Sequence, residues 1–344
     1  MTIVIFSKDR NDYLRSAINF YSQYEINTIV VHNCSVPLDS DEIPNQCMYL
    51  ASKLSIAERL MQAAFNLNSK FVILIPDDEF LIPEALNKIV LKMQNNENLL
   101  SCGGQTIALN KYDNRLTGVL AYSSLREYSN VNDSLFIRVN YHVKQNSGNR
   151  PVGSIYRVMR SDIFKKIALA LAKTLDRFSC KYTFEIIADL YLNIFGKAEY
   201  IDEIYWCRNW VNAAISDDSV MRELYFHLWW EREEYEIEKK SFIEILFPDF
   251  KEIMTLEEFI KILDKFYEGT KPLELRKLNR VVNRLTFGIF FRKLKIKIHL
   301  IFWKFKMLSR DDAVEILKYL DRERISYDTR QLTAALAEFK RVNF

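Results

Sequence analysis

The sequence predicts an α/β fold with a mixed central sheet, followed by a mostly α-helical C-terminal region. Short apolar runs alternate with segments of helical apolar spacing through the first half of the 344 residues. Hydrophobic residues make up 49% of the chain and charged residues 27%, which suits a packed core and a hydrated surface. Beyond about residue 216 the pattern is helical almost throughout. We therefore expect two domains, 1–215 and 216–344.

Strands and helices alternate in a regular order over the first hundred residues. Strands are expected over 2–6, 28–32 and 71–75, and helices over 12–24, 55–66 and 83–93. The stretch 100–160 is irregular, with short strand-like pieces at 107–109, 119–122 and 154–158. It also contains polar loops of the kind that often carry binding groups. Two helices and a strand complete the first domain, over 161–173, 182–195 and 198–206.

The strand expected over 71–75 ends in three consecutive carboxylates, Asp77, Asp78 and Glu79. The carboxyl ends of parallel strands face the crevice in which open α/β sheets bind ligands. Three adjacent carboxylates repel one another, and Mg²⁺ or Mn²⁺ with a substrate diphosphate would neutralise them. The alternative is a solvated turn in which Asp78 or Glu79 caps the next helix.

The scarcity of glycine excludes two common nucleotide sites. The chain has eight glycines, and the first is Gly103. Neither a dinucleotide-binding Gly-x-Gly-x-x-Gly turn nor a P-loop can therefore exist in the first hundred residues. The turn after the first strand instead reads Ser7, Lys8, Asp9, Arg10. A nucleotide bound there would be held mainly by a metal and by side-chain cations.

Cysteine usage and hydropathy predict a cytoplasmic protein. The five cysteines are scattered and form no C-x-x-C pair, so we expect reduced core residues and no zinc site. The N-terminus begins on an apolar strand and lacks the basic region and long apolar stretch of a signal peptide. No segment has about 18 uninterrupted apolar residues, so we expect no transmembrane helix.

These motifs resemble the A-type (GT-A) nucleotide-sugar glycosyltransferase fold over roughly residues 1–212. The resemblance is to its large inverting family, in particular the bacterial branch of surface-polysaccharide gene clusters. Residues 2–14 look like the first strand, turn and helix start of the family, and 28–35 are similar to its second strand. Asn33 stands where the family has an acid that contacts the base. The run 77–79 matches the acidic metal motif, which is usually Asp-x-Asp.

The resemblance implies a Rossmann-like nucleotide-binding domain and a specific set of site residues. The implied nucleotide-sugar contacts are Ser7, Asp9, Arg10, Asn33, Arg59, Asp77, Gly153 and Arg208. The implied metal ligand is Asp78, with Asp77 and Glu79 contributing directly or through water, and the metal is Mn²⁺ or Mg²⁺. For Arg59, a solvated position on the helix surface is an equal alternative.

The resemblance also implies a catalytic carboxylate at the start of the helix expected over 182–195. Glu185 and Asp189 lie four residues apart, on one helical face. Glu185 would accept the proton of the acceptor hydroxyl in an inverting single displacement, and Asp176 is a third candidate. A solvated helix explains these acids equally well. The implied partners are a nucleoside diphosphate sugar and a surface-glycan or lipid-linked acceptor.

Positive charge is concentrated in the stretch 271–308. Eleven Lys or Arg residues and a single acid, Glu274, lie between Lys271 and Lys306, which leaves the rest of the chain net negative. Apolar residues recur at helical spacing from 285 to 308. Such a segment can lie on an anionic membrane surface, here the inner face of the cell membrane, or pack on the catalytic domain or another subunit of a homo-oligomer. No nucleic-acid-binding module is apparent.

Two features leave other interpretations open. Trp206, Trp210, Trp229 and Trp230 could stack on an acceptor sugar, but aromatic residues at helical spacing beside a domain junction more often pack together. Asn33 and Glu79 depart from the family pattern. They allow a non-catalytic membrane-docking or assembly protein that retains a nucleotide-binding fold.

Overall fold

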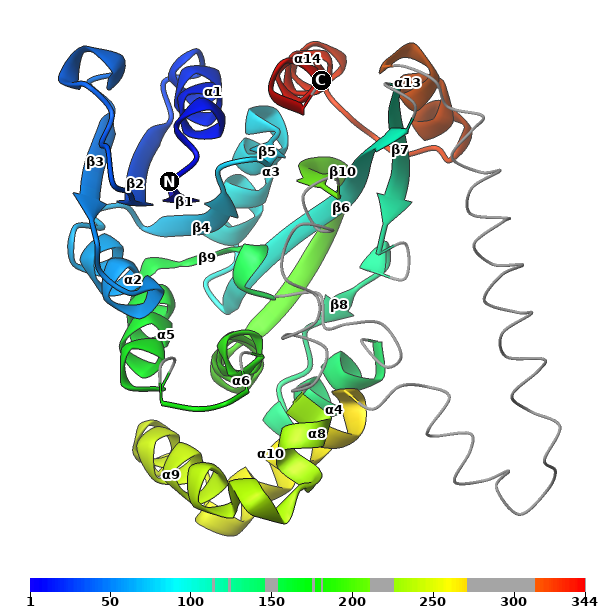
Figure 1. Ribbon diagram of the computed structural model, residues 1–344. Helices are drawn as coiled ribbons and strands as arrows, with labels where there is room; N and C mark the ends of the chain where they lie inside the picture. Colours follow the sequence, from blue (N-terminus) through cyan, green and yellow to red (C-terminus); the bar gives the residue numbers. More distant parts are fainter. Residues whose placement is uncertain are drawn as a thin grey trace, which may run out of the picture.

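The computed structural model confirms the α/β fold with a mixed central sheet and a helical C-terminal region (Figure 1). It describes residues 1–112, 115–122, 125–145, 154–174, 177–180, 182–210, 226–270 and 313–343. The expected domain boundary near 215 and the basic segment 271–308 lie outside the described residues.

The first part of the sheet consists of four parallel strands with helices between them. The strands are β1 (Thr2–Lys8), β2 (Asn27–Asn33), β3 (Cys47–Ser52) and β4 (Phe71–Pro76). The helices are α1 (Asn11–Ser22), α2 (Ile56–Phe65) and α3 (Pro83–Gln94), and a short 3₁₀ turn, η1, spans Ser40–Glu42. Strand β3 was not predicted from the sequence; its apolar run over 47–51 is short, and as an edge strand it is only partly buried.

The second part of the sheet is mixed in direction. Its strands are β5 (Phe80–Leu81), β6 (Leu99–Tyr112), β7 (Arg115–Ala121), β8 (Ser129–Asn130), β9 (Val158–Arg160) and β10 (Lys197–Asn209). Its helices are α4 (Leu135–Gln145), the 3₁₀ turn η3 (Ser154–Tyr156), α5 (Ser161–Thr174) and α6 (Thr183–Phe195). The expectation of an irregular stretch was wrong for α4. Its buried residues are Arg138, Val139 and His142, so polar side chains interrupt the apolar spacing of 135, 139 and 143.

Strand order determines which side chains share an edge of the sheet. The order is β3-β2-β1-β4-β9-β6-β10-β5, with β7 paired to β6 and β8 paired to β10. Strand β9 is antiparallel to both β4 and β6, and β10 is parallel to β6. Strands β1, β2, β4, β6 and β10 therefore run in the same direction. Their carboxyl ends lie along one edge.

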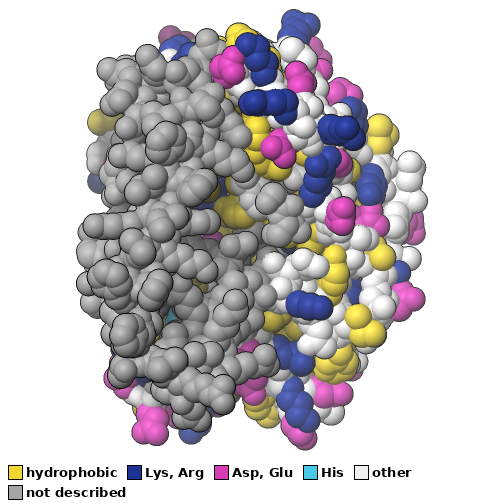
Figure 2. Space-filling model, turned by 90° about the vertical axis from the view of Figure 1, so that its right-hand side faces the viewer, with side chains coloured by type: hydrophobic (Ala, Val, Ile, Leu, Met, Phe, Trp, Pro, Cys, Tyr) yellow, Lys and Arg dark blue, Asp and Glu magenta, His cyan; other side chains and the backbone are white. Residues whose placement is uncertain are grey.

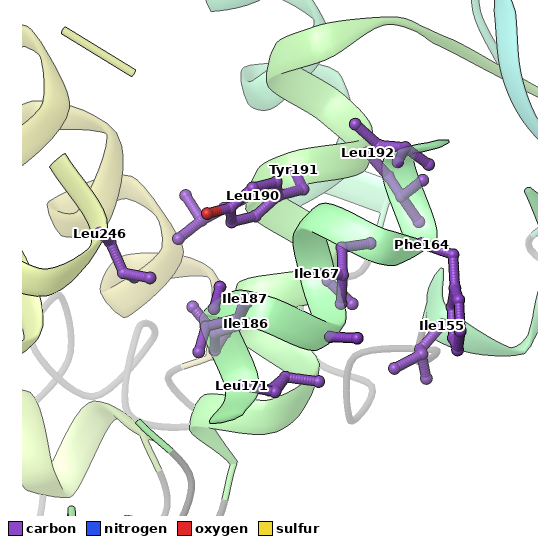
Figure 3. Close-up of a cluster of buried hydrophobic side chains, with 14 of the residues drawn as sticks. Ile155, Phe164, Ile167, Leu171, Ile186, Ile187, Leu190, Tyr191, Leu192 and Leu246 are labelled. Atoms are coloured by element: carbon purple, nitrogen blue, oxygen red, sulfur yellow. The ribbon is translucent and has the colours of Figure 1, made fainter. Parts of the chain in front are cut away.

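The sheet separates two hydrophobic clusters. Side chains of successive strand residues point to opposite faces, so Val4 belongs to one cluster whereas Ile3 and Ile5 belong to the other. Figure 3 shows part of the first cluster, where side chains of α5 and α6 lie against one another with Leu246 close by. Both faces of the sheet are thus covered, which explains the continuous apolar runs of β1 and β4.

The C-terminal helices form two groups at opposite ends of the molecule (Figure 1). The first group is α8 (Phe226–Glu231), η5 (Glu233–Tyr235), α9 (Glu236–Leu246), η6 (Phe247–Asp249) and α10 (Leu256–Thr270). The second is α13 (Ala313–Arg322) and α14 (Thr329–Asn343). The first group joins the cluster that contains Val4, and the second joins the cluster that contains Ile3.

The described surface carries charges of both signs. On the face in Figure 2, basic and acidic side chains are interspersed, with hydrophobic side chains between them. Within the described ranges, every helix is too short or too polar to cross a membrane.

Candidate functional site

The acidic run is buried at the shared carboxyl edge of the sheet. The backbone N–H of Asp77 donates to the carbonyl of Phe6, 3.0 Å away, so pairing between β1 and β4 continues into the run. Asp77 is fully buried, and Asp78 and Glu79 are each 6% exposed. The cap position of α3 is Ile82, which makes no side-chain cap bond. The alternative of a solvated, helix-capping turn was therefore wrong.

Arg10 pairs with both aspartates. Its Nη1 donates to Asp78 Oδ2 at 2.9 Å, and its Nη2 donates to Asp77 Oδ1. Partial burial opposes the charge of Arg10, but Asp77 and Asp78 outweigh this effect and raise the pKa of Arg10. The guanidinium thus joins the end of β1 to the end of β4.

Asp77 keeps one carboxylate oxygen without a regular hydrogen bond. Burial raises the pKa of Asp77 to about 7, although the charge of Arg10 and the nearby Ser7 hydroxyl lower it. Asp77 Oδ2 and Ser7 Oγ are both buried, and neither makes a hydrogen bond of regular geometry to a described residue. Hence Arg10 satisfies Asp77 only in part.

Glu79 contacts Trp206 and Arg208 and not Arg10, the partner of the two aspartates. The indole Nε1 of Trp206 donates to Glu79 Oε2 at 2.7 Å, and Arg208 Nε lies 3.8 Å from Glu79 Oε1. Burial raises the pKa of Glu79 to about 8, and the charge of Arg208 opposes this rise. The three consecutive carboxylates therefore do not converge on one point.

Arg208 is held between aromatic rings at the end of β10. Its guanidinium carbon lies 5.3 Å from the ring centre of Trp206 and 5.5 Å from that of Tyr122. The side chain is 31% exposed. The expectation of packing holds for Trp206, which is buried, and its N–H orients Glu79 as well. Arg208 is thus a partly solvent-facing cation beside the acidic run.

Tyr156 connects the candidate base Glu185 with the acidic run. The Tyr156 ring centre lies 5.2 Å from that of Trp206, and Tyr205 Oη donates to the Tyr156 carbonyl at 3.1 Å. Burial raises the pKa of Tyr156, and the negative charges of Glu185, Glu79 and Asp78 raise it further. Glu185, which is half-buried on α6, and the acidic run therefore both act on the same tyrosine.

Asp189, one helical turn after Glu185, lies in an interior network. It is 1% exposed, 3.0 Å from His142 Nε2, and accepts a hydrogen bond from the backbone N–H of Ser154 at 3.3 Å. Tyr128 Oη lies 3.0 Å from the other ring nitrogen of His142. A solvated helix does not describe Asp189, and its contacts link α6 with α4 and η3. The other two candidates of this region, Asp176 and Gly153, lie outside the described residues.

Asp9 and Asn33 shape the turn after β1. Asp9 has a φ of 51°, and its backbone N–H donates to the Asn33 carbonyl at 3.0 Å. Asp9 Oδ1 accepts from the Ser35 N–H at 3.0 Å, while Asn33 Nδ2 donates to the Leu54 carbonyl at 3.1 Å. Both residues lie at the carboxyl edge, as the strand-end pattern predicts, and each of these hydrogen bonds involves a backbone group.

Arg59 on α2 forms hydrogen bonds with both β1 and β2. Its Nη1 donates to the carbonyls of Ser7 and Val31, each at 3.0 Å, and the residue is 6% exposed. The alternative of a solvated arginine on the helix surface was wrong. Arg59 fixes the ends of β1 and β2 relative to each other.

The sequence analysis missed three residues next to the acidic run. Asn209 Nδ2 lies 3.3 Å from both Asp78 Oδ2 and Asn343 Oδ1, and Tyr13 Oη donates to Asn343 Oδ1 at 3.2 Å. Asn209 ends β10, so the strand-end rule could have found it. Asn343 carries no such signal, because only the fold of α14 brings it to the site.

The residues present fit a divalent cation in chemistry. Among the described residues, no group of three His, Cys, Asp or Glu side chains is gathered as metal ligands would be. Asp77 and Asp78 nevertheless already share one cationic partner, and their oxygens are the hard ligands that Mg²⁺ and Mn²⁺ prefer. Two carboxylates with substrate oxygens could complete such a site.

Comparison with known proteins gives a structural likeness only. No protein-family model matches the chain, and no curated protein has significant sequence similarity to it. Residues 1–349 of S. aureus TarS share 13% identity, with 78% of this chain and 81% of that one covered and a TM-score of 0.41. The complex of TarS 1–349 with UDP-GlcNAc shares 15% identity, with 79% of this chain and 82% of that one covered and a TM-score of 0.42. A longer TarS chain shares 15% identity, with 79% of this chain and 49% of that one covered and a TM-score of 0.41. At these values the likeness assigns no role to any residue here.

Proposed function

We propose that this chain is a glycosyltransferase that moves a sugar from a nucleoside diphosphate sugar to a surface-glycan or lipid-linked acceptor. One observation carries the proposal: at the carboxyl edge of the sheet the buried acidic run is paired with two partly exposed arginines, Arg10 with Asp77 and Asp78, and Arg208 with Glu79. Arginines recognise diphosphate oxygens, and buried carboxylates recognise the cation that accompanies them. The edge is also where α/β sheets bind nucleotides.

Charge stabilisation of the leaving diphosphate is the first task of this site. Negative charge grows on the diphosphate as its bond to the sugar breaks. Arg208, oriented by the rings of Trp206 and Tyr122 and by Glu79, would stabilise that charge. A Mn²⁺ or Mg²⁺ ion, when held by Asp78 with Asp77, neutralises further charge on the diphosphate.

Glu185 is the proposed general base. The acceptor hydroxyl must lose its proton as its oxygen attacks the anomeric carbon, and an inverting single displacement needs no covalent intermediate. Glu185 is half-buried at the start of α6, and its negative charge acts on Tyr156, as the charge of Glu79 does, which supports this role. Asp189 is buried beside His142 and the Ser154 N–H, and we assign it a structural role.

Nucleotide binding tests the proposal directly. UDP or GDP with Mn²⁺ should raise the melting temperature of the protein, and Asp78→Asn should abolish this shift. Asp12→Asn is the matched control, because Asp12 lies on α1 with its side chain 91% exposed. No stabilisation by either nucleotide, with Mn²⁺ or Mg²⁺, would refute the proposed function.

Product analysis with a panel of nucleotide sugars tests the catalytic step. Glu185→Gln should lower transfer about 100-fold or more while leaving nucleotide binding intact. The exposed acid Glu252, changed to Gln, provides the control. Full activity of Glu185→Gln would assign the base elsewhere. Nucleotide binding without transfer of any sugar would instead favour a non-catalytic assembly protein.

Membrane docking through 271–308 is part of the proposal for the acceptor. A lipid-linked acceptor would be reached most directly from the inner face of the cell membrane, and the basic composition of 271–308 suits an anionic surface. Sedimentation with anionic liposomes should be strong at low salt and weak at high salt. Absence from the pellet at both would favour packing of the segment.

A further inference from the structure

Arg10 occupies the position that a divalent cation would need. Each of its two terminal nitrogens pairs with a different carboxylate, Nη1 with Asp78 and Nη2 with Asp77. The arginine side chain is 35% exposed, whereas that of Asp77 is fully buried. The guanidinium therefore enters the carboxylate pair from the open side of the site, where a ligand would also arrive.

Two neighbouring buried carboxylates are stabilised in their charged forms by a positive partner. An uncompensated buried charge is strongly destabilising, and here one arginine serves two acids. A metal ion that takes Asp77 Oδ1 and Asp78 Oδ2 as ligands must displace Arg10 from these two oxygens. Arg10 and the metal cannot both bind these two carboxylate oxygens.

Asp77 provides a second, independent sign that a ligand is accepted here. Its Oδ2 is buried without a regular hydrogen bond, although its Oδ1 is paired with Arg10. A buried carboxylate oxygen is normally satisfied. Once Arg10 has left Oδ1, both oxygens of Asp77 would be open to a metal.

After displacement, Arg10 would pair with the diphosphate while Tyr13 supports its side chain. The guanidinium carbon lies 5.3 Å from the ring centre of Tyr13 on α1, and this ring can support the side chain after it leaves the carboxylates. A diphosphate that binds beside the metal offers two or more anionic oxygens. These match the planar fork of the arginine.

We propose that Arg10 is a built-in counter-ion that exchanges between the Asp77–Asp78 pair and the diphosphate of the substrate. Without ligands it neutralises the carboxylates, and with metal bound it pairs with the diphosphate. This inference rests on the proposed function. Because Arg10 opposes metal alone but favours diphosphate in the presence of metal, it couples the two binding steps and makes them cooperative.

Arg10→Gln tests the exchange through binding alone. The first measurement is Mn²⁺ affinity without nucleotide, from the electron paramagnetic resonance signal of free Mn²⁺. The second is UDP and GDP affinity at saturating Mn²⁺, from calorimetry. Loss of Arg10 should raise Mn²⁺ affinity about three-fold or more and weaken nucleotide affinity about ten-fold. These changes have opposite signs, which a general loss of structure would not produce.

Arg15→Gln is the matched control. Arg15 lies on the same helix, α1, and pairs with Glu42 and Asp12 at the surface. Neither affinity should change. If Arg10→Gln folds poorly, Arg10→Lys gives the same comparison, because an ammonium is a point charge that cannot pair with both carboxylates as a fork does.

The outcomes separate the exchange from the proposed function. Unchanged or weaker Mn²⁺ binding in Arg10→Gln, or no Mn²⁺ binding by either protein, would overturn the exchange even if nucleotides bind. Failure of the wild-type protein to bind UDP or GDP under any condition would overturn the proposed function. Stronger Mn²⁺ binding together with weaker nucleotide binding would establish the exchange.

Discussion

The two groups of C-terminal helices have similar sequence patterns and different relations to the candidate site. Residues 226–270 pack on α4, α5 and α6, where Trp229, Phe242 and Phe259 are fully buried. Residues 313–343 pack on α1, β5 and β7, and Asn343 at the end of α14 lies beside Asp78's partner Asn209. One group supports the helical layer, and the other borders the acidic run.

This difference teaches what hydrophobic periodicity can and cannot tell. An apolar stripe shows that one helix face is buried, but it does not identify the surface that covers it. Helices α10 and α14 each have one buried stripe, yet they belong to clusters on opposite sides of the sheet. That 216–344 forms one domain remains a prediction. Its described parts, 226–270 and 313–343, pack in two different hydrophobic clusters.

The largest expected effect comes from a pair of core truncations, one in each group. Phe259→Ala in α10 and Phe339→Ala in α14 should each lower the free energy of unfolding by about 3 to 5 kcal/mol, because both side chains are fully buried. Chemical denaturation measures this loss. Only Phe339→Ala should also weaken UDP binding, since α14 borders the site. Equal nucleotide affinity in the two variants would contradict the idea that only the group of α13 and α14 affects the site.

Glu238 should be important for the first group alone. Its carboxylate accepts from Trp229 Nε1 at 2.8 Å and from the Ser179 N–H and hydroxyl at 2.9 and 2.7 Å. Glu238→Gln should cost about 1 to 3 kcal/mol, because an amide cannot accept all three bonds. Nucleotide affinity should be unchanged; a weaker affinity would indicate coupling between this group and the site.

The same residue predicts a dependence of stability on pH. Burial raises the pKa of Glu238, but its hydrogen bonds with Ser179 and Trp229 outweigh burial and hold the pKa below its ordinary value of 4.5. A depressed folded-state pKa stabilises the protein above the unfolded value, and this contribution is lost as the pH falls below about 4.5. Melting curves between pH 3 and 6 should show a smaller acid-side loss for Glu238→Gln than for the wild type.

Gln331 should have a smaller effect, in the second group. Its side-chain oxygen accepts from the backbone N–H of Glu84 at 2.7 Å and so caps α3, which lacks a cap of its own. Gln331→Ala should cost about 1 kcal/mol. Gln331→Glu keeps an acceptor and should restore most of the stability. An Ala variant as stable as the wild type would show that water replaces this cap.

Asn343→Ala should have the smallest effect on stability and a selective effect on binding. Its side chain makes hydrogen bonds to Tyr13 and Asn209 at 3.2 and 3.3 Å, which position Asn209 near Asp78. We expect a change of under about 1 kcal/mol in unfolding and a few-fold loss of nucleotide affinity. Calorimetry with UDP and Mn²⁺ measures the latter. An unchanged affinity would limit α14 to a packing role.

The sequence predicted those parts of the fold and site that depend on local pattern. The run that ends in Asp77 was found because a buried parallel strand needs continuous apolar residues and strand ends bind ligands. Strand β3 and helix α4 were not predicted, because β3 is a short, half-exposed edge strand and the buried face of α4 includes Arg138 and His142. The pairing of Arg10 with the carboxylates, and the burial of Arg59, depend on long-range packing that one sequence does not reveal.

The contact of α14 with α1 has a consequence for biosynthesis. Ser16 on α1 donates to Glu338 on α14, and 322 positions of the chain separate them. At roughly 5 to 20 residues per second, a ribosome needs about 15 to 65 s to add that length. During this time the first strand, its helix and the acidic run are present in the nascent chain while the surface that receives α14 is still uncovered. The packing of α1 against α14 can therefore be completed only after almost the whole of this chain has been synthesised.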